Sequence, residues 1–239
     1  MASSAYVVSA ISYSSNSKFW AVQNPGAYLG RARGDNGGMY VASSGLTVEI
    51  ARTAARMVVE DGVELGRAKR RAAEQLGAAP RTPLPDTALV EEAIREHIAL
   101  FCADTQPGEL RALRELALLW MERLQAFRPY VGGAVWSGTA TRHVDIYLQL
   151  FCDDPKSAEI ALIDQGVAYD ASTVQGLHGR PVEALSVATF SEALGERVGV
   201  HLLVYDHDDL RGALRPGEGG RTPRGDAAAL RKLLLEHPE

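Results

Sequence analysis

Two carboxylates and a glycine-rich turn are the residues of this sequence whose types and spacing suit chemistry. Gly132 and Gly133 follow a short apolar run, and Asp145 stands further along the chain, in the next apolar run, 144–151. Glycine lets a backbone approach a phosphate closely, and carboxylate oxygens are the ligands that Mg²⁺ prefers. A second carboxylate, Glu183, lies in a later apolar run. These residues are the candidates for a functional site.

The stretch from Gly132 to Leu148 resembles the signature of the polymerase-beta-like nucleotidyltransferase superfamily. In that family a Gly-Gly or Gly-Ser pair follows a short strand, and Asp-x-Asp or Asp-x-Glu comes about ten residues later on the next strand. The closest part of the match is Gly-Thr-Ala-Thr-x-x-x-Asp-Ile-x-Leu, residues 138–148. The resemblance covers roughly residues 108–206. It implies a mixed-sheet α+β domain that transfers a nucleotidyl group from a nucleoside triphosphate to a hydroxyl, with Mg²⁺ bound by the carboxylates.

The resemblance also assigns roles to residues. Asp145 takes the first acidic position, and the order of the strands makes Glu183 the preferred third acid, with His201 on the next strand as the less favoured counterpart. Asp145 and Glu183 are therefore the predicted catalytic and metal-binding residues. The residues predicted to contact the nucleotide are Gly133, Ala134, Gly138 and Thr139.

The sequence departs from the family's pattern at two positions. Tyr147 stands where the second acid is expected, and a phenol with a pKa near 10 is a poor ligand for Mg²⁺. Ala134 replaces the serine that would contribute a hydroxyl. Two functions therefore stay open: a divergent, magnesium-dependent nucleotidyltransferase, or a catalytically inactive binding or interaction module with the same fold.

Each candidate residue also has a structural interpretation. Asp145 can pair at the start of a strand, Glu183 can be a solvated carboxylate, and the glycines can form tight turns. The sequence His-Asp-Asp at 207–209 could suggest a metal site, but Asp208 or Asp209 is better explained as the cap of a short helix at 210–214. The basic residues of segment 67–71 have acidic neighbours and are typical of a solvated helix face.

The apolar spacing predicts which elements position these residues. Strands in runs after a crossover helix favour a mixed sheet in an α+β domain, preceded by an α-helical segment. The expected units are a weakly folded extension (1–45) with a small hairpin between Tyr6–Val8 and Met39–Val41, a helical segment (46–106), and the nucleotidyltransferase-like domain with its basic tail (107–239). The expected helices are 47–76, 87–101, 107–127, one from Asp154 to Gly166, and short pieces in 207–235; the expected strands are 131–136, 144–151, 167–174, 181–190 and 198–206.

Composition indicates the cellular compartment and the kinds of partner to expect. The chain has 239 residues, a formal net charge of −5 and two widely separated cysteines, Cys102 and Cys152, which we expect to be reduced thiols. It has no apolar stretch of about 20 residues and no secretory signal at its start, so a cytoplasmic protein without a membrane segment is expected. The charge gives no strong nucleic-acid signal. The expected partner is a nucleotide or phosphate ligand, and the sequence names no protein partner.

Overall fold

A six-stranded mixed sheet organises the larger part of the molecule. The computed structural model describes residues 40–210 and 222–236. The strands lie in the order β3-β4-β5-β2-β1-β6. The central pair, β2 and β5, is parallel, whereas every other neighbouring pair is antiparallel. The predicted α+β class with a mixed sheet is therefore confirmed. The strands are β1 (Tyr130–Gly132), β2 (Ile146–Cys152), β3 (Asp170–Gln175), β4 (Pro181–Ser191), β5 (Glu196–Asp206) and β6 (Arg224–Gly225).

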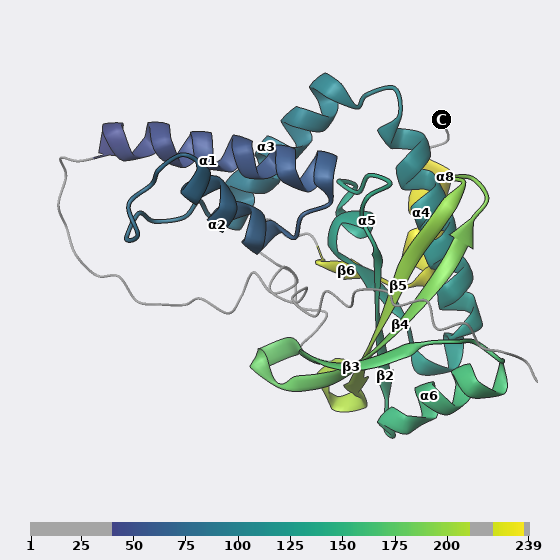
Figure 1. The fold of residues 1–239 in the computed structure, drawn as a ribbon. Coiled ribbons are helices and arrows are strands. Elements are labelled where there is room, and N and C mark those ends of the chain that lie inside the picture. Colours follow the sequence, from purple (N-terminus) through teal and green to yellow (C-terminus); the bar gives the residue numbers. More distant parts are fainter. Residues whose placement is uncertain (1–39, 211–221, 237–239) are drawn as a thin grey trace, which may run out of the picture.

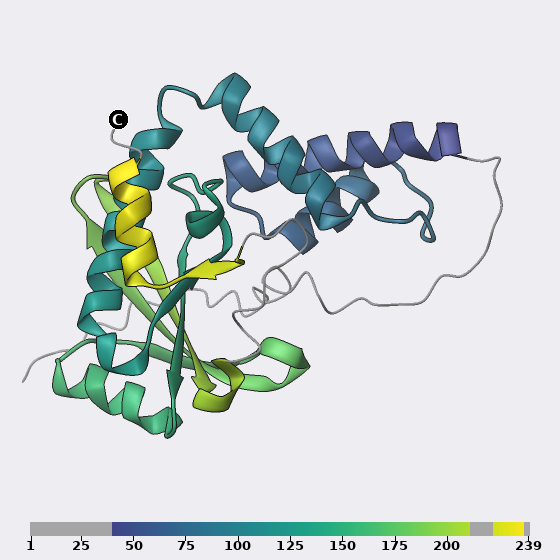
Figure 2. The same ribbon diagram turned by 180° about the vertical axis from the view of Figure 1, so that it is seen from behind.

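Three helices cover one face of this sheet (Figures 1 and 2). They are α4 (Gln106–Arg123), α6 (Pro155–Asp164) and α8 (Ala227–Glu236). Their apolar faces pack on alternate residues of the central strands, as the period-2 geometry of strands requires. This core includes Leu113, Trp120, Leu148, Leu162, Leu202 and Leu230. It leaves the opposite face of the sheet for the side chains discussed below.

The N-terminal helices form a second unit with its own core (Figure 1). They are α1 (Tyr40–Asp61), α2 (Leu65–Gln75) and α3 (Thr87–Phe101). The predicted helical segment 47–76 is divided in two, because Gly62 has a φ of 62°, in the left-handed region that ends a helix. The predicted bounds of α3 are those observed, and Asp86 caps it by accepting a hydrogen bond from the Leu89 N–H (2.7 Å).

The corner between α1 and α2 lies against the loop that leads into β2. The Thr141 hydroxyl, which is buried, donates a hydrogen bond to the carbonyl oxygen of Val59 (3.1 Å). A Cβ atom at position 62 would lie 2.5 Å from the carbonyl oxygen of His143. The helical unit therefore holds the loop just before Asp145 in place.

Three sequence predictions need correction. The expected strand 131–136 ends at Gly132, and residues 133–137 form the short helix α5 (Gly133–Ser137), entered through Gly133 at a φ of 62°. The expected helix 107–127 ends at Arg123 and continues as the 3-10 turn η1 (Gln125–Phe127). Tyr40 and Val41 belong to α1 rather than to a hairpin strand, and the other half of that hairpin lies outside the described residues.

Two further 3-10 turns, η2 (Leu177–Gly179) and η3 (His207–Asp209), complete the described elements. Asp206 caps η3, accepting from the Asp208 N–H (2.9 Å). None of the helices in the described ranges has the length and apolarity needed to cross a membrane.

Candidate functional site

A polar cluster lies on the face of the sheet opposite the three helices. On β2, Leu148 belongs to the helix-facing core, so Tyr147 points to the other face. Tyr147 is the Cα partner of His201 on β5, and His201 is the partner of Ser186 on β4. Register partners share a face, so these three side chains form one row across three strands. With Asp145, just before β2, they are called the Asp145 cluster.

Hydrogen bonds fix Asp145 at both oxygens. Its Oδ1 accepts from the Gly199 N–H (3.0 Å), and its Oδ2 lies 3.2 Å from His201 Nε2. His201 Nδ1 lies 2.9 Å from the hydroxyl oxygen of Ser186. An ionised carboxylate only accepts, so His201 donates through Nε2 and its Nδ1 accepts from the hydroxyl when the ring is neutral. The side chains of Asp145 and His201 remain 39% and 25% exposed, so a ligand can reach them.

The charge of Asp145 is favoured by its surroundings. Burial pushes the pKa of Asp145 upward, but the hydrogen bond and charge of His201 and the Gly199 N–H outweigh it and hold the pKa below its ordinary value. Asp145 is therefore a carboxylate at neutral pH, and His201 is already its hydrogen-bond partner.

Tyr147 is held in its neutral form. Burial raises the pKa of Tyr147, and the negative charges of Asp145 and Glu64 raise it further. Its ring stacks on that of His201, with centroids 4.8 Å apart and planes 22° from parallel. Where the family's pattern has a second carboxylate, this chain therefore presents a neutral aromatic ring.

Glu183 lies elsewhere on the sheet. It is the Cα partner of Val204 on β5, whereas Asp145 contacts Gly199, five residues away, which corresponds to about 17 Å along a strand. In addition, β5 lies between β2 and the strand that carries Glu183. Mg²⁺ ligands lie near 2 Å, so Asp145 and Glu183 cannot share a metal ion. The sequence-based pairing of these two carboxylates is corrected.

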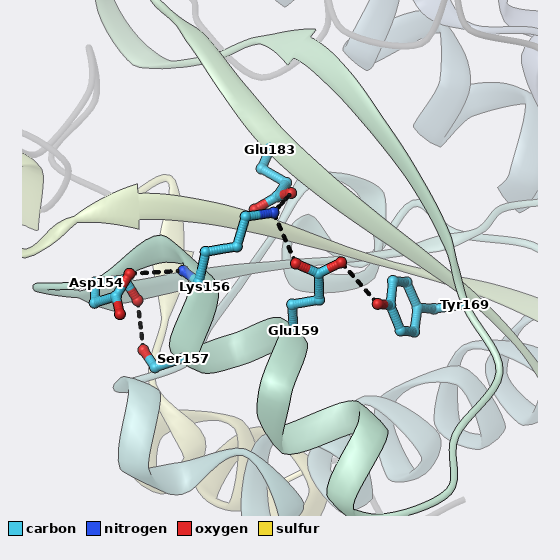
Figure 3. Close-up of polar contacts among 6 residues, drawn as sticks. All are labelled: Asp154, Lys156, Ser157, Glu159, Tyr169 and Glu183. Carbon is cyan, nitrogen blue, oxygen red and sulfur yellow. Dashed lines mark hydrogen bonds and ion pairs between the residues drawn. The ribbon is translucent and has the colours of Figure 1, made fainter.

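Glu183 belongs instead to an ion-pair network at the far end of the sheet (Figure 3). Lys156 Nζ lies 2.9 Å from Glu183 Oε1 and 2.7 Å from Glu159 Oε2. The Tyr169 hydroxyl donates to the other oxygen of Glu159 (2.7 Å). Hydrogen bonds from Lys156 and Tyr169 hold the pKa of Glu159 below its ordinary value. This network ties α6 to β4.

His201, rather than Glu183, lies beside Asp145. The structure brings His201 to Asp145 because β5, not β4, is the direct neighbour of β2. The sequence analysis named His201 and ranked it second. The sequence did not indicate which later strand pairs in parallel with β2, and that pairing decides which side chain reaches Asp145.

The backbone N–H groups of Gly138 and Thr139 and the Thr139 hydroxyl form hydrogen bonds within the protein. Both backbone N–H groups donate to the carbonyl oxygen of Ala134 (3.0 and 2.9 Å), which closes the end of α5. The Thr139 hydroxyl lies 3.0 Å from that of Ser137. Gly138 has a φ of 87°, as expected of a residue that ends a helix. These contacts favour the tight-turn interpretation for Gly138 and Thr139, whereas the roles of Gly133 and Ala134 toward a ligand stay predictions.

Two polar residues of α4 that the sequence analysis missed anchor this turn. Gln106 donates through its amide to the carbonyl oxygens of Gly138 (3.1 Å) and Ala140 (2.9 Å). Arg114 donates to the carbonyl oxygens of Val135 (3.1 Å) and Trp136 (3.4 Å). Both side chains are buried. The sequence did contain a sign of this role, because Arg114 lies within the apolar face of the helix predicted at 107–127.

The donors of the Asp145 cluster do not fit a two-magnesium centre. One carboxylate, an imidazole, a neutral phenol and a hydroxyl contain a single anionic oxygen ligand, whereas two hard dications require several. Within residues 40–210 and 222–236, no three His, Cys, Asp or Glu side chains come together as a metal site would need. The cluster is better suited to hydrogen bonding than to metal binding.

The fold and this cluster define an α+β protein with a hydrogen-bonded polar site on the sheet face opposite α4, α6 and α8. No protein-family model matches the chain, and no curated protein matches it. Solved structures do. The complex of Cid1 with the UTP analogue UMPNPP is 14% identical with a TM-score of 0.30, and it aligns over 48% of this chain and 36% of that one. A Cid1 poly(U) polymerase structure is 16% identical (TM-score 0.29, covering 46% and 34%), and a cytoplasmic RNA terminal U-transferase is 18% identical (TM-score 0.27, covering 42% and 31%).

The chain thus spans about a third of the length of the solved chains it matches. Those proteins are described as a poly(U) polymerase and an RNA terminal U-transferase. The prediction of no strong nucleic-acid signal finds no support in the comparisons. A likeness at this level says nothing about the substrate or activity of this chain.

Proposed function

We propose that this protein is a nucleotidyltransferase-like binding module that holds a nucleotide at the Asp145 cluster without magnesium-dependent transfer. The observation that carries the proposal is the contact of 3.2 Å between Asp145 Oδ2 and His201 Nε2. It engages the carboxylate where the motif would have a metal ligand, and Tyr147 supplies a neutral ring where a second acid would stand.

The cluster offers contacts that suit a nucleoside. Asp145 is partly exposed and ionised, so it can accept hydrogen bonds from a ribose hydroxyl or a base amino group. His201 and Tyr147 present stacked rings beside it. The hydroxyl of Ser186 completes a set of polar groups fixed on rigid strands, which suits specific binding.

Calorimetric titration of nucleoside triphosphates, with magnesium and with a chelator, tests the proposal. We expect binding of similar strength in both conditions and no nucleotidyl transfer. Asp145→Asn should weaken binding about tenfold or more, as loss of one charged hydrogen bond does. Absence of binding by the folded wild-type protein would reject the proposal.

Tyr147→Asp tests whether a metal site has been lost at this position. The substitution creates carboxylates two residues apart on one strand face, so magnesium should now strengthen nucleotide binding. Without metal, the variant should be less stable than the wild type because a buried charge is added beside Asp145. Titration of magnesium and a non-hydrolysable triphosphate into both proteins gives the comparison. Equal magnesium dependence in the two proteins would count against a lost metal site.

Gly199→Ala tests the orientation of Asp145 without removing its charge. A Cβ atom at position 199 would lie 2.6 Å from Asp145 Oδ1, so the carboxylate must move away from His201. We expect nucleotide binding to fall as it does for Asp145→Asn, with the secondary structure retained by circular dichroism. Gly195→Ala on the same hairpin is the control: nothing lies within 4 Å of the new atom, so the φ of 68° should lower stability by about 1–2 kcal/mol while nucleotide binding is kept.

The second candidate is magnesium-dependent transfer of a nucleotidyl group to a hydroxyl acceptor. Its support is Asp145, an accessible carboxylate at the first acidic position of the motif. Turnover of a nucleoside triphosphate by the wild-type protein, abolished by Asp145→Asn and by the chelator, would establish this function in place of the binding module.

A further inference from the structure

A second charged group lies on the same sheet face, away from the Asp145 cluster. Arg224 on β6 is only 5% exposed. Its Nη1 donates to the side-chain oxygen of Gln149 (2.7 Å), and Gln149 is itself 1% exposed. Gln149 is four residues along β2 from Asp145, which places the two groups about 13 Å apart. The Cα partner of Arg224 on β1 is Gly132, which carries no side chain.

The guanidinium has no carboxylate partner in the described part of the chain. None of the ion pairs among residues 40–210 and 222–236 includes Arg224, and its Nε–H has no hydrogen-bond acceptor there. Among the described residues, its hydrogen bond goes to the neutral amide of Gln149. A buried charge without a counter-charge costs free energy, because neither water nor an anion compensates for its lost solvation.

The other buried arginine provides a contrast. Arg114 is 7% exposed, yet its Nε and Nη2 donate to the carbonyl oxygens at the end of α5. That side chain has an evident structural role. In Arg224 the Nε–H on the corresponding edge has no acceptor among the described residues. This edge is the planar fork that binds both oxygens of a carboxylate or phosphate.

Electrostatics favours an anion here. Burial lowers the pKa of Arg224, and the neighbouring Tyr205 offsets part of that effect. Arginine nevertheless stays charged in proteins. An oxyanion on its free edge would supply both the missing counter-charge and the missing hydrogen-bond acceptors.

We propose that Arg224 is the central residue of a metal-independent oxyanion site, which binds a phosphate or carboxylate group of a ligand on the β6–β1–β2 side of the sheet face. Gln149 orients the guanidinium, and the anion accepts from Nε and Nη2. The site does not depend on the function proposed for the Asp145 cluster, since it uses other residues and no metal.

Thermal unfolding in a non-coordinating buffer, with inorganic phosphate as the first probe, tests this site. If phosphate reaches a hundred times its dissociation constant, the wild-type midpoint should rise by about 5–10 °C. Arg224→Met keeps the aliphatic stem and removes the charge, so the saturable part of this rise should disappear. Arg114→Met is the matched control and should keep it, which separates binding from the general stabilisation that phosphate gives proteins. Succinate and adenosine monophosphate, titrated in the same way, distinguish a carboxylate ligand from a phosphate monoester.

The unfolding midpoints of the two variants should also differ when no anion is present. Arg224→Met should unfold at or above the wild-type midpoint, because an uncompensated buried charge has been removed. Arg114→Met should unfold well below it. A large loss of stability or failure to fold in Arg224→Met would show a structural role and overturn the proposal. So would a wild-type protein with no saturable response to phosphate, succinate or the nucleotide, or an equal response in Arg224→Met.

Discussion

Gly62→Ala is expected to destabilise the protein by about 3 kcal/mol, one of the two largest effects predicted. Gly62 has a φ of 62°, where an alanine costs about 1–2 kcal/mol. The added Cβ would also lie 2.5 Å from the carbonyl oxygen of His143, a backbone atom that cannot move away freely, and overpacking adds about 1–3 kcal/mol. Urea unfolding followed by circular dichroism measures the change.

Gly77→Ala is the matched control for this effect. Gly77 has nearly the same φ, 66°, at the end of α2, but nothing lies within 4 Å of a Cβ built there. Its substitution should therefore cost only the conformational part, about 1–2 kcal/mol. Equal losses in the two variants would mean that the contact between the α1–α2 corner and the loop before Asp145 contributes nothing.

Arg114→Met is expected to cost about 3 kcal/mol. The side chain is buried, and the substitution leaves the carbonyl oxygens of Val135 and Trp136 without their donor. Each hydrogen bond from a charged group contributes about 1.5–3 kcal/mol, and burial of unpaired carbonyls adds to the loss. Guanidinium chloride unfolding followed by circular dichroism gives the free energy.

Arg111→Met on the same helix is the comparison for this variant. Arg111 is 38% exposed and pairs with Glu115 at i, i+4 on the surface (2.9 Å). Such pairs contribute about 0.3–0.5 kcal/mol, so the change should be small. If Arg111→Met lost as much stability as Arg114→Met, the capping of α5 by Arg114 would not be the cause.

Local signals in the sequence were sufficient for most of the elements. Asp86 before α3 and Asp154 followed by Pro155 before α6 are start signals, and both aspartates accept hydrogen bonds from backbone N–H groups as expected. The apolar runs of β4 and β5 were also placed within two residues of their observed bounds. In each case the determining contacts lie within a few residues of one another.

The site required contacts between distant segments, and here the sequence was less informative. Whether His201 or Glu183 approaches Asp145 depends on which strand pairs with β2, and alternating apolar residues do not specify that. Val135 and Trp136 favour a strand by their residue types. They are helical because Gly133 turns the chain and Arg114 binds the carbonyl groups at the end of α5. No residue near them in sequence indicates that arginine.

The parallel pairing at the centre of the sheet also bears on how the protein folds. The hydrogen bond between Asp145 and Gly199 joins residues 54 positions apart, whereas β4 and β5 form a hairpin across a short turn. Long-range pairings close late because the entropy of the intervening chain must be lost first. His201 and Ser186 should therefore meet early, and Asp145 should join them only when β2 docks. During synthesis on the ribosome, the cluster cannot exist until β5 has left the exit tunnel, and β6 and α8 join the sheet and its core after it.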